Sequence, residues 1–393
     1  MIAGRLRIAM LAHSTNPRGS VVHALEVGDA LAAAGHDVVV HAPDPGGTGF
    51  CRATRCRTAA LPARAIVGGL FEMVETRSAE YVAHFSAPSA ERFDLYHAQD
   101  GISGNALARL RELGAIPGFL RTVHHLDAFA DARLAARQMR AVTAADRVLC
   151  VSRVWQEILA CDHGIAASRV GNGVDTARFS PNPDGADAAL RARLGLDGGP
   201  VFLAVGGIEE RKNTRRILQA FAKVRNARPD AQLVIAGGAS LLDHSAARGA
   251  FDAALRETGL ATGPGAAVIA TGTLADAEMP PLYRLADALV FPSLREGFGL
   301  VVLEAMASGT PVIVSRMTPF TEYLAADDCL WVEPTSVGEI AAAMVGACDA
   351  ATRHRLAAAG HSVCRHHTWQ ESARRHLEAY ARWLRSSREA AHA

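Results

Sequence analysis

The sequence has almost no excess of charge of either sign. Its formal net charge is +1 over 393 residues, so bulk electrostatic attraction to nucleic acid is not expected. The sequence also lacks any stretch near the roughly 18 uninterrupted apolar residues that a membrane-spanning helix needs. A short basic start precedes the apolar run at Ile8, as in a signal peptide, but no small-residue cleavage site follows. We therefore interpret this run as a first β-strand.

Paired cysteine motifs are missing as well. The seven cysteines are dispersed, and only Cys51 and Cys56 lie close together. A zinc site there would need two more ligands nearby, which the sequence does not offer. An odd, dispersed set indicates reduced thiols and a cytoplasmic location. The arginines of residues 51–64 fit a solvated loop, and at most a peripheral contact with anionic lipid.

Short apolar runs alternate with helix-length segments along most of the chain. Such alternation predicts parallel sheets covered by helices. A segment rich in Pro, Asp and Gly, residues 179–187, interrupts it. We therefore expect an α/β chain of two doubly wound, Rossmann-like domains, 1–180 and 181–366, followed by a helix over 367–393. The predicted strands lie within residues 6–11, 37–42, 93–98, 119–123, 147–151, 200–206, 232–238, 266–272, 288–293 and 311–315.

The most informative segment is LVFPSLREGFGLVVLEAMASGTPVIVS, residues 289–315. It predicts a strand, a turn containing Gly297 and Gly299, a helix and a strand. The unpaired N–H groups at the start of that helix favour an anion such as a diphosphate. Glu296 precedes the helix, and Glu304 comes eight residues later, a span of roughly 12 Å if it is mostly helical. The bare spacing of two glutamates fits equally a helix cap and a surface residue, so the context has to decide.

That context resembles the signature of the retaining glycosyltransferases called family 4, which have the two-domain GT-B fold. The resemblance extends to VGGIEERKNTRRILQAF (residues 205–221), LYRLADALVFPS (282–293), NGVDTARFSP (172–181), CVSRVWQEIL (150–159), HAQDGISG (97–104) and RTVHHLDAF (121–129). It implies two facing domains and a last helix, WQESARRHLEAY from residue 369, that crosses back to the first domain.

The resemblance also implies roles for individual residues. Glu296 would hydrogen-bond hydroxyls of the donor sugar, and Glu304 would bind the ribose. Arg211 and Lys212 would neutralise the diphosphate as it leaves. The remaining donor contacts would come from Gly297, Phe298, Gly299 and Leu300, from Gly19 in the first turn, and from Leu274 near the base. No metal ligand and no cofactor besides the donor substrate are implied.

His124 corresponds to the family's cleft histidine. It follows a strand at a carboxyl end, where open sheets bind ligands. The alternatives are that His125 has this place, or that both are ordinary loop residues. His97, Asp100 and Ser20 are candidate acceptor or cleft residues, because His97 and Asp100 also follow a strand.

The sequence departs from the family pattern at two places. The family usually has two adjacent glycines in the first turn, whereas this chain has only Gly19. Many members have an arginine where this chain has Gly207. Arg211, beside Lys212, is then expected to replace that arginine.

The expected activity is transfer of a hexosyl group from a UDP-, GDP- or ADP-linked sugar to an acceptor hydroxyl. Without an evident carboxylate nucleophile or an Asp-x-Asp motif, we expect metal-independent, same-face substitution. The alternative of another class is a catalytically silent sugar-nucleotide-binding or scaffold protein of the same fold. A nicotinamide dehydrogenase would need GxGxxG in the first turn, which is absent. A third alternative is an epimerase or a sugar-phosphate synthase of similar architecture.

Overall fold

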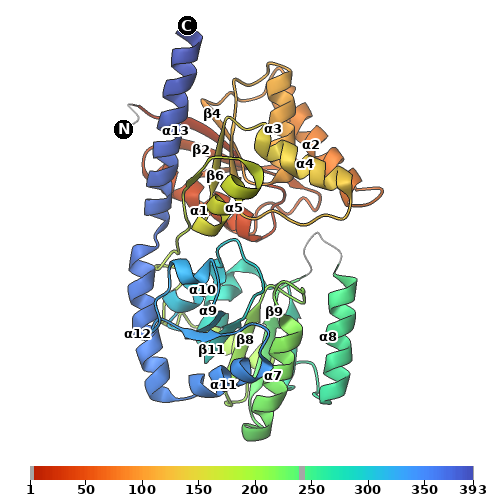
Figure 1. The fold of residues 1–393 in the computed structure, drawn as a ribbon, viewed down its shortest axis with the longest axis vertical. Helices are drawn as coiled ribbons and strands as arrows, with labels where there is room; N and C mark the ends of the chain where they lie inside the picture. The colour runs from red at the N-terminus through yellow and green to blue at the C-terminus, as the bar shows by residue number, and fades with distance from the viewer. Residues whose placement is uncertain (1–3, 239–243, 393) are drawn as a thin grey trace. The chain divides into compact units, whose positions relative to one another are not determined.

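The computed structural model describes residues 4–238 and 244–392. The chain forms two compact units, named here unit 1 (Met1–Asn172 and Trp369–Ala393) and unit 2 (Gly173–Thr368) (Figure 1). The units therefore divide a few residues away from the expected boundaries at 180 and 366. The expected linker, 179–187, belongs to unit 2 because Phe179 is buried against Tyr283 of the same unit, with ring centroids 5.9 Å apart.

Unit 1 is a seven-stranded parallel sheet in the order β3-β2-β1-β4-β5-β6-β7. Its strands are β1 (Arg7–Leu11), β2 (Asp37–Asp44), β3 (Arg57–Pro62), β4 (Leu95–Ala98), β5 (Leu120–Val123), β6 (Arg147–Cys150) and β7 (Ala167–Arg169). Its helices are α1 (Gly19–Ala33), α2 (Leu70–Ser86), α3 (Gly101–Glu112), α4 (Ala132–Thr143), α5 (Arg153–His163) and the final α13 (Trp369–His392). The order reverses between β1 and β4, which is where open sheets bind ligands.

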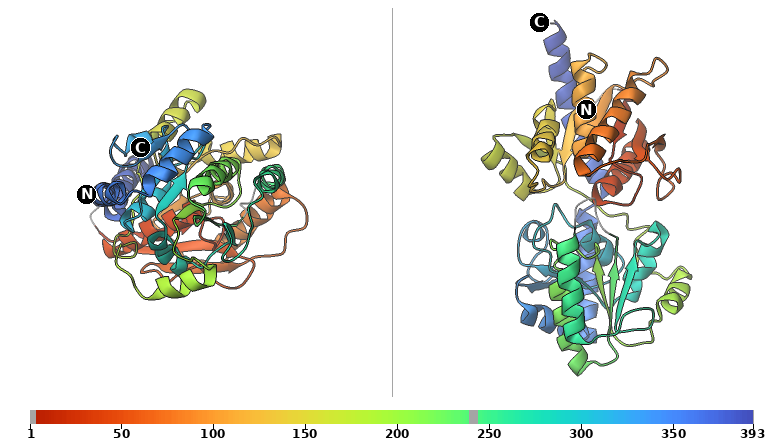
Figure 2. Two further views of the ribbon diagram at one scale, coloured as in Figure 1. Left: turned by 90° about the horizontal axis from the view of Figure 1, so that it is seen from below. Right: turned by 90° about the vertical axis from the view of Figure 1, so that its right-hand side faces the viewer.

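Unit 2 repeats the arrangement with six parallel strands in the order β10-β9-β8-β11-β12-β13. The strands are β8 (Val201–Val205), β9 (Gln232–Ala236), β10 (Val268–Gly272), β11 (Ala288–Phe291), β12 (Val312–Ser315) and β13 (Leu330–Val332). Helices cover both faces of this sheet (Figure 2). They are α6 (Ala186–Leu194), α7 (Thr214–Ala227), α8 (Ser245–Thr258), α9 (Met279–Leu285), α10 (Leu300–Ala307), α11 (Val337–Ala347) and α12 (Ala350–His366), with 3-10 turns at Asp276–Glu278 and Phe320–Glu322. Here the order reverses between β8 and β11.

Burial explains which strands were predictable. The central strands are almost wholly buried on both faces, so they read as continuous apolar runs. Of the four edge strands in the described part of the chain, β10 was predicted, whereas β3, β7 and β13, which are short or partly exposed, were not. Residues 57–62, interpreted as part of an arginine-bearing loop, form β3. No helix in the described part of the chain is both long and apolar enough to cross a bilayer.

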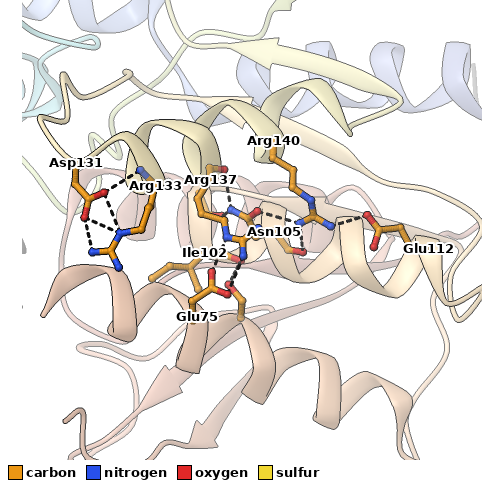
Figure 3. A network of polar contacts seen from close by, with 10 residues as sticks. Glu75, Ile102, Asn105, Glu112, Asp131, Arg133, Arg137 and Arg140 are labelled. Carbon is orange, nitrogen blue, oxygen red and sulfur yellow. Dashed lines mark hydrogen bonds and ion pairs between the residues drawn. The ribbon is translucent and has the colours of Figure 1, made fainter. Parts of the chain in front are cut away.

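Charged pairs bind α4 to its neighbours in unit 1. Arg137 donates to Glu75 of α2 at 2.6 Å, and Arg140 donates to Glu112 and Asn105 of α3 at 2.6 and 3.0 Å (Figure 3). Gln138 exchanges two hydrogen bonds with the backbone of Asp127 in the preceding loop. The network therefore anchors the loop that leaves β5.

Candidate functional site

Two loops meet in unit 2 where its strand order reverses. Residues 206–213 leave the carboxyl end of β8, and residues 292–299 leave that of the neighbouring β11. The backbone N–H of Leu294 donates to the carbonyl of Arg211 at 2.9 Å, which joins the loops directly. The sheet topology thus brings together residues that are some eighty positions apart.

Glu296, Arg211 and Lys212 form the centre of this site. Glu296 Oε1 accepts hydrogen bonds from Arg211 Nη1 at 2.9 Å and from Lys212 Nζ at 2.8 Å. The Glu296 side chain is 7% exposed and that of Lys212 is 13% exposed. Burial alone would raise the pKa of Glu296, but the two cations outweigh burial and leave its pKa below the ordinary value. The structure therefore brings these three predicted residues into direct contact.

A fourth charged residue, Glu209, was not anticipated from the sequence. It is buried, and its Oε2 lies 3.2 Å from Arg211 Nη2. Lys212 Nζ also lies 4.4 Å from the ring centroid of Phe291. Burial lowers the pKa of Lys212, while Glu296 acts in the opposite direction. Lys212 is one of only two lysines in the sequence, the other being Lys223.

The second glutamate of the motif is held by a tyrosine. Glu304 lies on α10, half-buried, and its Oε2 accepts a hydrogen bond from the Tyr283 hydroxyl at 2.7 Å. Tyr283 is fully buried on α9, so it fixes the orientation of the carboxylate. This contact was not predicted from the sequence, although Tyr283 lies within a segment that carried the resemblance.

The turn before α10 requires glycine at position 299. Gly299 has φ +94°, and a Cβ there would lie 2.7 Å from a ring carbon of Phe320. Next to it the Phe298 ring stacks on Tyr323 with centroids 4.8 Å apart, and the Tyr323 hydroxyl donates to the Phe298 carbonyl. Gly297 and Leu300 are half-exposed. These contacts hold the backbone at the start of α10 in one conformation.

Gly207 has a structural reason to differ from arginine. Its φ is +74°, and a Cβ would lie 2.8 Å from the carbonyl oxygen of Gly238. Asn213, at the N-cap position of α7, has φ +62° and makes no side-chain capping hydrogen bond. Its amide instead donates to the carbonyls of Pro292 and Pro334 at 2.9 and 2.6 Å, joining three loops of unit 2.

In unit 1, His124 follows β5 and is half-buried, whereas His125 is exposed. His124 Nε2 lies 3.1 Å from the Oε1 of Gln99 in the loop after β4. Burial and nearby basic groups, His23 among them, hold the pKa of His124 well below its ordinary value, so its imidazole is neutral. His125 Nε2 instead lies 3.4 Å from Asp127 Oδ1, so the two histidines have different partners.

The candidate acceptor residues have different surroundings. His97 is fully buried, and its nitrogens pair with the hydroxyls of Tyr380 and Thr122, each at 2.8 Å. Its position joins β4, β5 and α13, which differs from the expected position in a cleft. Asp100 caps α3 by accepting from the Ser103 N–H, and it lies 3.7 Å from His13 Nδ1.

The remaining predicted residues are Gly19 and Ser20 in the first turn of α1, and Leu274 in the loop after β10. Gly19 is exposed and Ser20 half-exposed at the start of α1. A Cβ on Gly19 would meet nothing within 4 Å, so packing does not require glycine there. Leu274 is half-buried after β10. Within residues 4–238 and 244–392, no group of three His, Cys, Asp or Glu residues is arranged to hold a metal ion.

Family models match both halves of the chain. Residues 187–361 match the model of glycosyl transferases group 1, and residues 17–178 match that of Glycosyltransferase Family 4. The chain belongs to this glycosyltransferase family. Its fold is GT-B, as in sucrose-phosphate synthase from Thermosynechococcus elongatus, with a TM-score of 0.77 at 24% identity over 97% of this chain and 100% of that one.

Other relatives are similar over shorter segments or at lower identity. A D-inositol 3-phosphate glycosyltransferase from Mycobacterium sp. (strain JLS) is 31% identical over 57% of this chain and 52% of its own length. A GDP-mannose-dependent mannosyltransferase from Mycolicibacterium smegmatis is 33% identical over 44% of each chain. The chain thus spans about half the length of these curated relatives, or less. The Anabaena protein HepE in complex with UDP and glucose has a TM-score of 0.75 at 16% identity, covering 96% of this chain and 100% of its own.

Proposed function

We propose that this chain is a retaining glycosyltransferase that moves a hexosyl group from a nucleoside-diphosphate sugar to an acceptor hydroxyl. The observation that carries the proposal is the convergence of Arg211 and Lys212 on Glu296, beside the start of α10. Two side-chain cations and the N–H groups of a helix start are the groups that bind a diphosphate. A carboxylate between them is suited to the hydroxyls of the sugar attached to it.

The proposed reaction is a same-face substitution. The bond between the anomeric carbon and the diphosphate oxygen breaks, and the acceptor oxygen bonds to that carbon from the same side. The acceptor proton passes to the departing diphosphate. Arg211 and Lys212 stabilise the charge that develops on the leaving oxygens, so the proposal requires no metal ion. Glu304, oriented by Tyr283, is proposed to accept hydrogen bonds from the ribose.

The identity of the donor is suggested only by relatives. HepE is described in complex with UDP and glucose, and the mannosyltransferase from Mycolicibacterium smegmatis is named as GDP-mannose-dependent. UDP-, GDP- and ADP-hexoses are therefore the donors to test. In unit 1, His124 is proposed to face the donor sugar and the acceptor; the acceptor is left open.

The test is a thermal-shift screen with UDP, GDP, ADP and their hexose conjugates, followed by activity assays with the donor selected. Ligand binding to the native state raises the unfolding temperature by mass action. NMR of the product should show the anomeric configuration of the donor retained, and EDTA should leave the rate unchanged. Lys212→Met should abolish most turnover, whereas the matched change Lys223→Met on exposed α7 surface should not.

Either of two results would contradict the proposal. Inverted product stereochemistry would refute the mechanism. Nucleotide binding by the folded wild type without transfer or donor hydrolysis, across acceptors, would favour a silent binding protein of this fold.

A further inference from the structure

Four histidines of unit 1 lie in ring contact and form what we call the histidine cluster. They are His23 on α1, His97 on β4, His124 after β5 and His376 on α13. The His23 ring centroid lies 4.8 Å from that of His124 and 5.4 Å from that of His376, and His376 lies 5.6 Å from His97. His23, His97 and His376 are fully buried, so only His124 can reach a substrate.

His23 is the member of the cluster that contacts the two residues at which the chain leaves and re-enters unit 1. Its Nδ1 lies 2.7 Å from Oδ1 of Asn172, the last residue of the first segment of the unit. Its ring meets Trp369, the first residue of the second segment, edge to face with centroids 5.7 Å apart. The Ser372 hydroxyl also donates to the Gly171 carbonyl at 3.1 Å, which ties these two segments together.

The chemistry of His23 fits a supporting role. Because the Asn172 amide oxygen accepts, His23 Nδ1 carries the proton and Nε2 keeps its lone pair. That Nε2 is buried without a hydrogen-bond partner among the described residues. Burial lowers the pKa of His23 to about 4, so the ring that faces His124 is uncharged near neutral pH. A neutral ring can pack against His124 without repelling it.

We propose that His23 is a positioning residue, which fixes the ring of His124 and ties it to Asn172 and Trp369. The inference rests on the proposed function, in which His124 faces the reacting groups. It adds a link between that site and the chain segments that leave unit 1. Asn172 and Trp369 are the residues at which the chain leaves and re-enters unit 1, so His23 joins His124 to both of these points.

The test uses His23→Phe, which keeps a flat ring and removes the N–H donor, and Asn172→Ala, which removes the acceptor. Each should lower kcat by about 10- to 100-fold. The KM for the donor should stay unchanged, because the proposed donor residues Glu296 and Glu304 lie in unit 2. The double variant should lose no more than either single variant, because both break one contact.

His41→Phe is the matched control. His41 is a buried histidine on β2 that packs against Phe85 and Phe93, outside the histidine cluster. Its variant should keep the wild-type kcat. An equal loss in His41→Phe, an unchanged kcat in His23→Phe, or additive losses in the double variant would each overturn the proposal. If His23→Phe does not fold, Asn172→Ala decides the question alone.

A second readout does not depend on activity. The ¹⁵N resonances of the His124 ring should shift in His23→Phe and stay unchanged in His41→Phe. Unchanged His124 resonances in His23→Phe would overturn the positioning role. A wild type without transfer activity would instead refute the proposed function, and a shifted resonance would still support the contact.

Discussion

Glu296→Gln should tighten the binding of a free nucleoside diphosphate while it slows sugar transfer. In the structure the Glu296 carboxylate pairs with the two cations that are proposed to bind the diphosphate. Its Oε1 lies 2.9 Å from Arg211 Nη1 and 2.8 Å from Lys212 Nζ. A diphosphate without a sugar has to compete with this carboxylate. A glutamine has the same shape but a neutral oxygen, so it competes less.

The size of the effect follows from the strength of these bonds. A hydrogen bond to a charged group contributes about 1.5–3 kcal/mol, against about 0.5–1.5 kcal/mol for a neutral one. Weakening two such bonds by about 1–1.5 kcal/mol each should therefore favour the diphosphate by about 2–3 kcal/mol, or roughly 30- to 150-fold in Kd. Transfer should fall by about 100-fold, because a charged contact to the donor sugar is lost in the transition state.

Calorimetric titration with UDP, GDP and ADP at one ionic strength measures the first effect, and initial rates measure the second. Glu304→Gln is the comparison, because Glu304 is proposed to hold the ribose and its change should weaken binding of the same nucleotides. Opposite signs for the two variants are the expected result. If Glu296→Gln weakens diphosphate binding as Glu304→Gln does, Glu296 does not compete for the cations and the reasoning is wrong.

Three further results are expected. Gly207→Arg should destabilise the protein by about 1–3 kcal/mol without increasing its activity, because a side chain there is both strained and crowded. Thermal unfolding measures the loss of stability. The control is Gly249→Ala on α8, where a Cβ would meet nothing within 4 Å. A nucleoside diphosphate should protect Lys212 but not Lys223 from a lysine-directed acylating reagent, read by peptide mass spectrometry, and equal labelling with and without nucleotide would contradict the site. The free energy of unfolding should fall as pH drops below about 6.5, because burial lowers the pKa of His41 to about 3 and the unfolded chain then binds the extra proton. His41→Phe should reduce that slope by about 1.4 kcal/mol per pH unit in chemical denaturation, with no change in slope above pH 6.5.

The central strands of both units could be predicted because they are buried on both faces. β8 and β11 are continuous apolar runs, and glycine or proline turns bound them. The edge strand β3 could not be recognised, because its residues are mostly exposed and carry no period. The division between the units lies away from the expected boundary because a contact between residues distant in the sequence decides it. Composition alone marks residues 179–187 as a linker, but Phe179 packs on a helix a hundred residues later.

The residues of the site also differ in how well the sequence could predict them. The glutamates and the Arg-Lys pair were recognised because they lie in short segments with a local pattern. His97 was expected near a substrate because it follows the rule for strand ends. The structure buries it under α13, where the Tyr380 hydroxyl lies 2.8 Å from its Nδ1. That contact spans 283 residues. The resemblance implied that the last helix returns to the first unit, but no local pattern shows that Tyr380 of this helix covers His97.

The departure from the family pattern at Gly207 is consistent with the packing of the loops around it. Gly206 and Gly207 both have positive φ, and a Cβ on Gly207 would meet the carbonyl of Gly238. The loops after β8 and β9 therefore approach too closely for a side chain at this position. Arg211, four residues later, supplies the guanidinium from the other end of the same loop. Glu209 pairs with Nη2 of this guanidinium, and Glu296 pairs with its Nη1. The close loop packing and the displaced arginine are thus two parts of one arrangement, so restoring the family residue alone should damage the site.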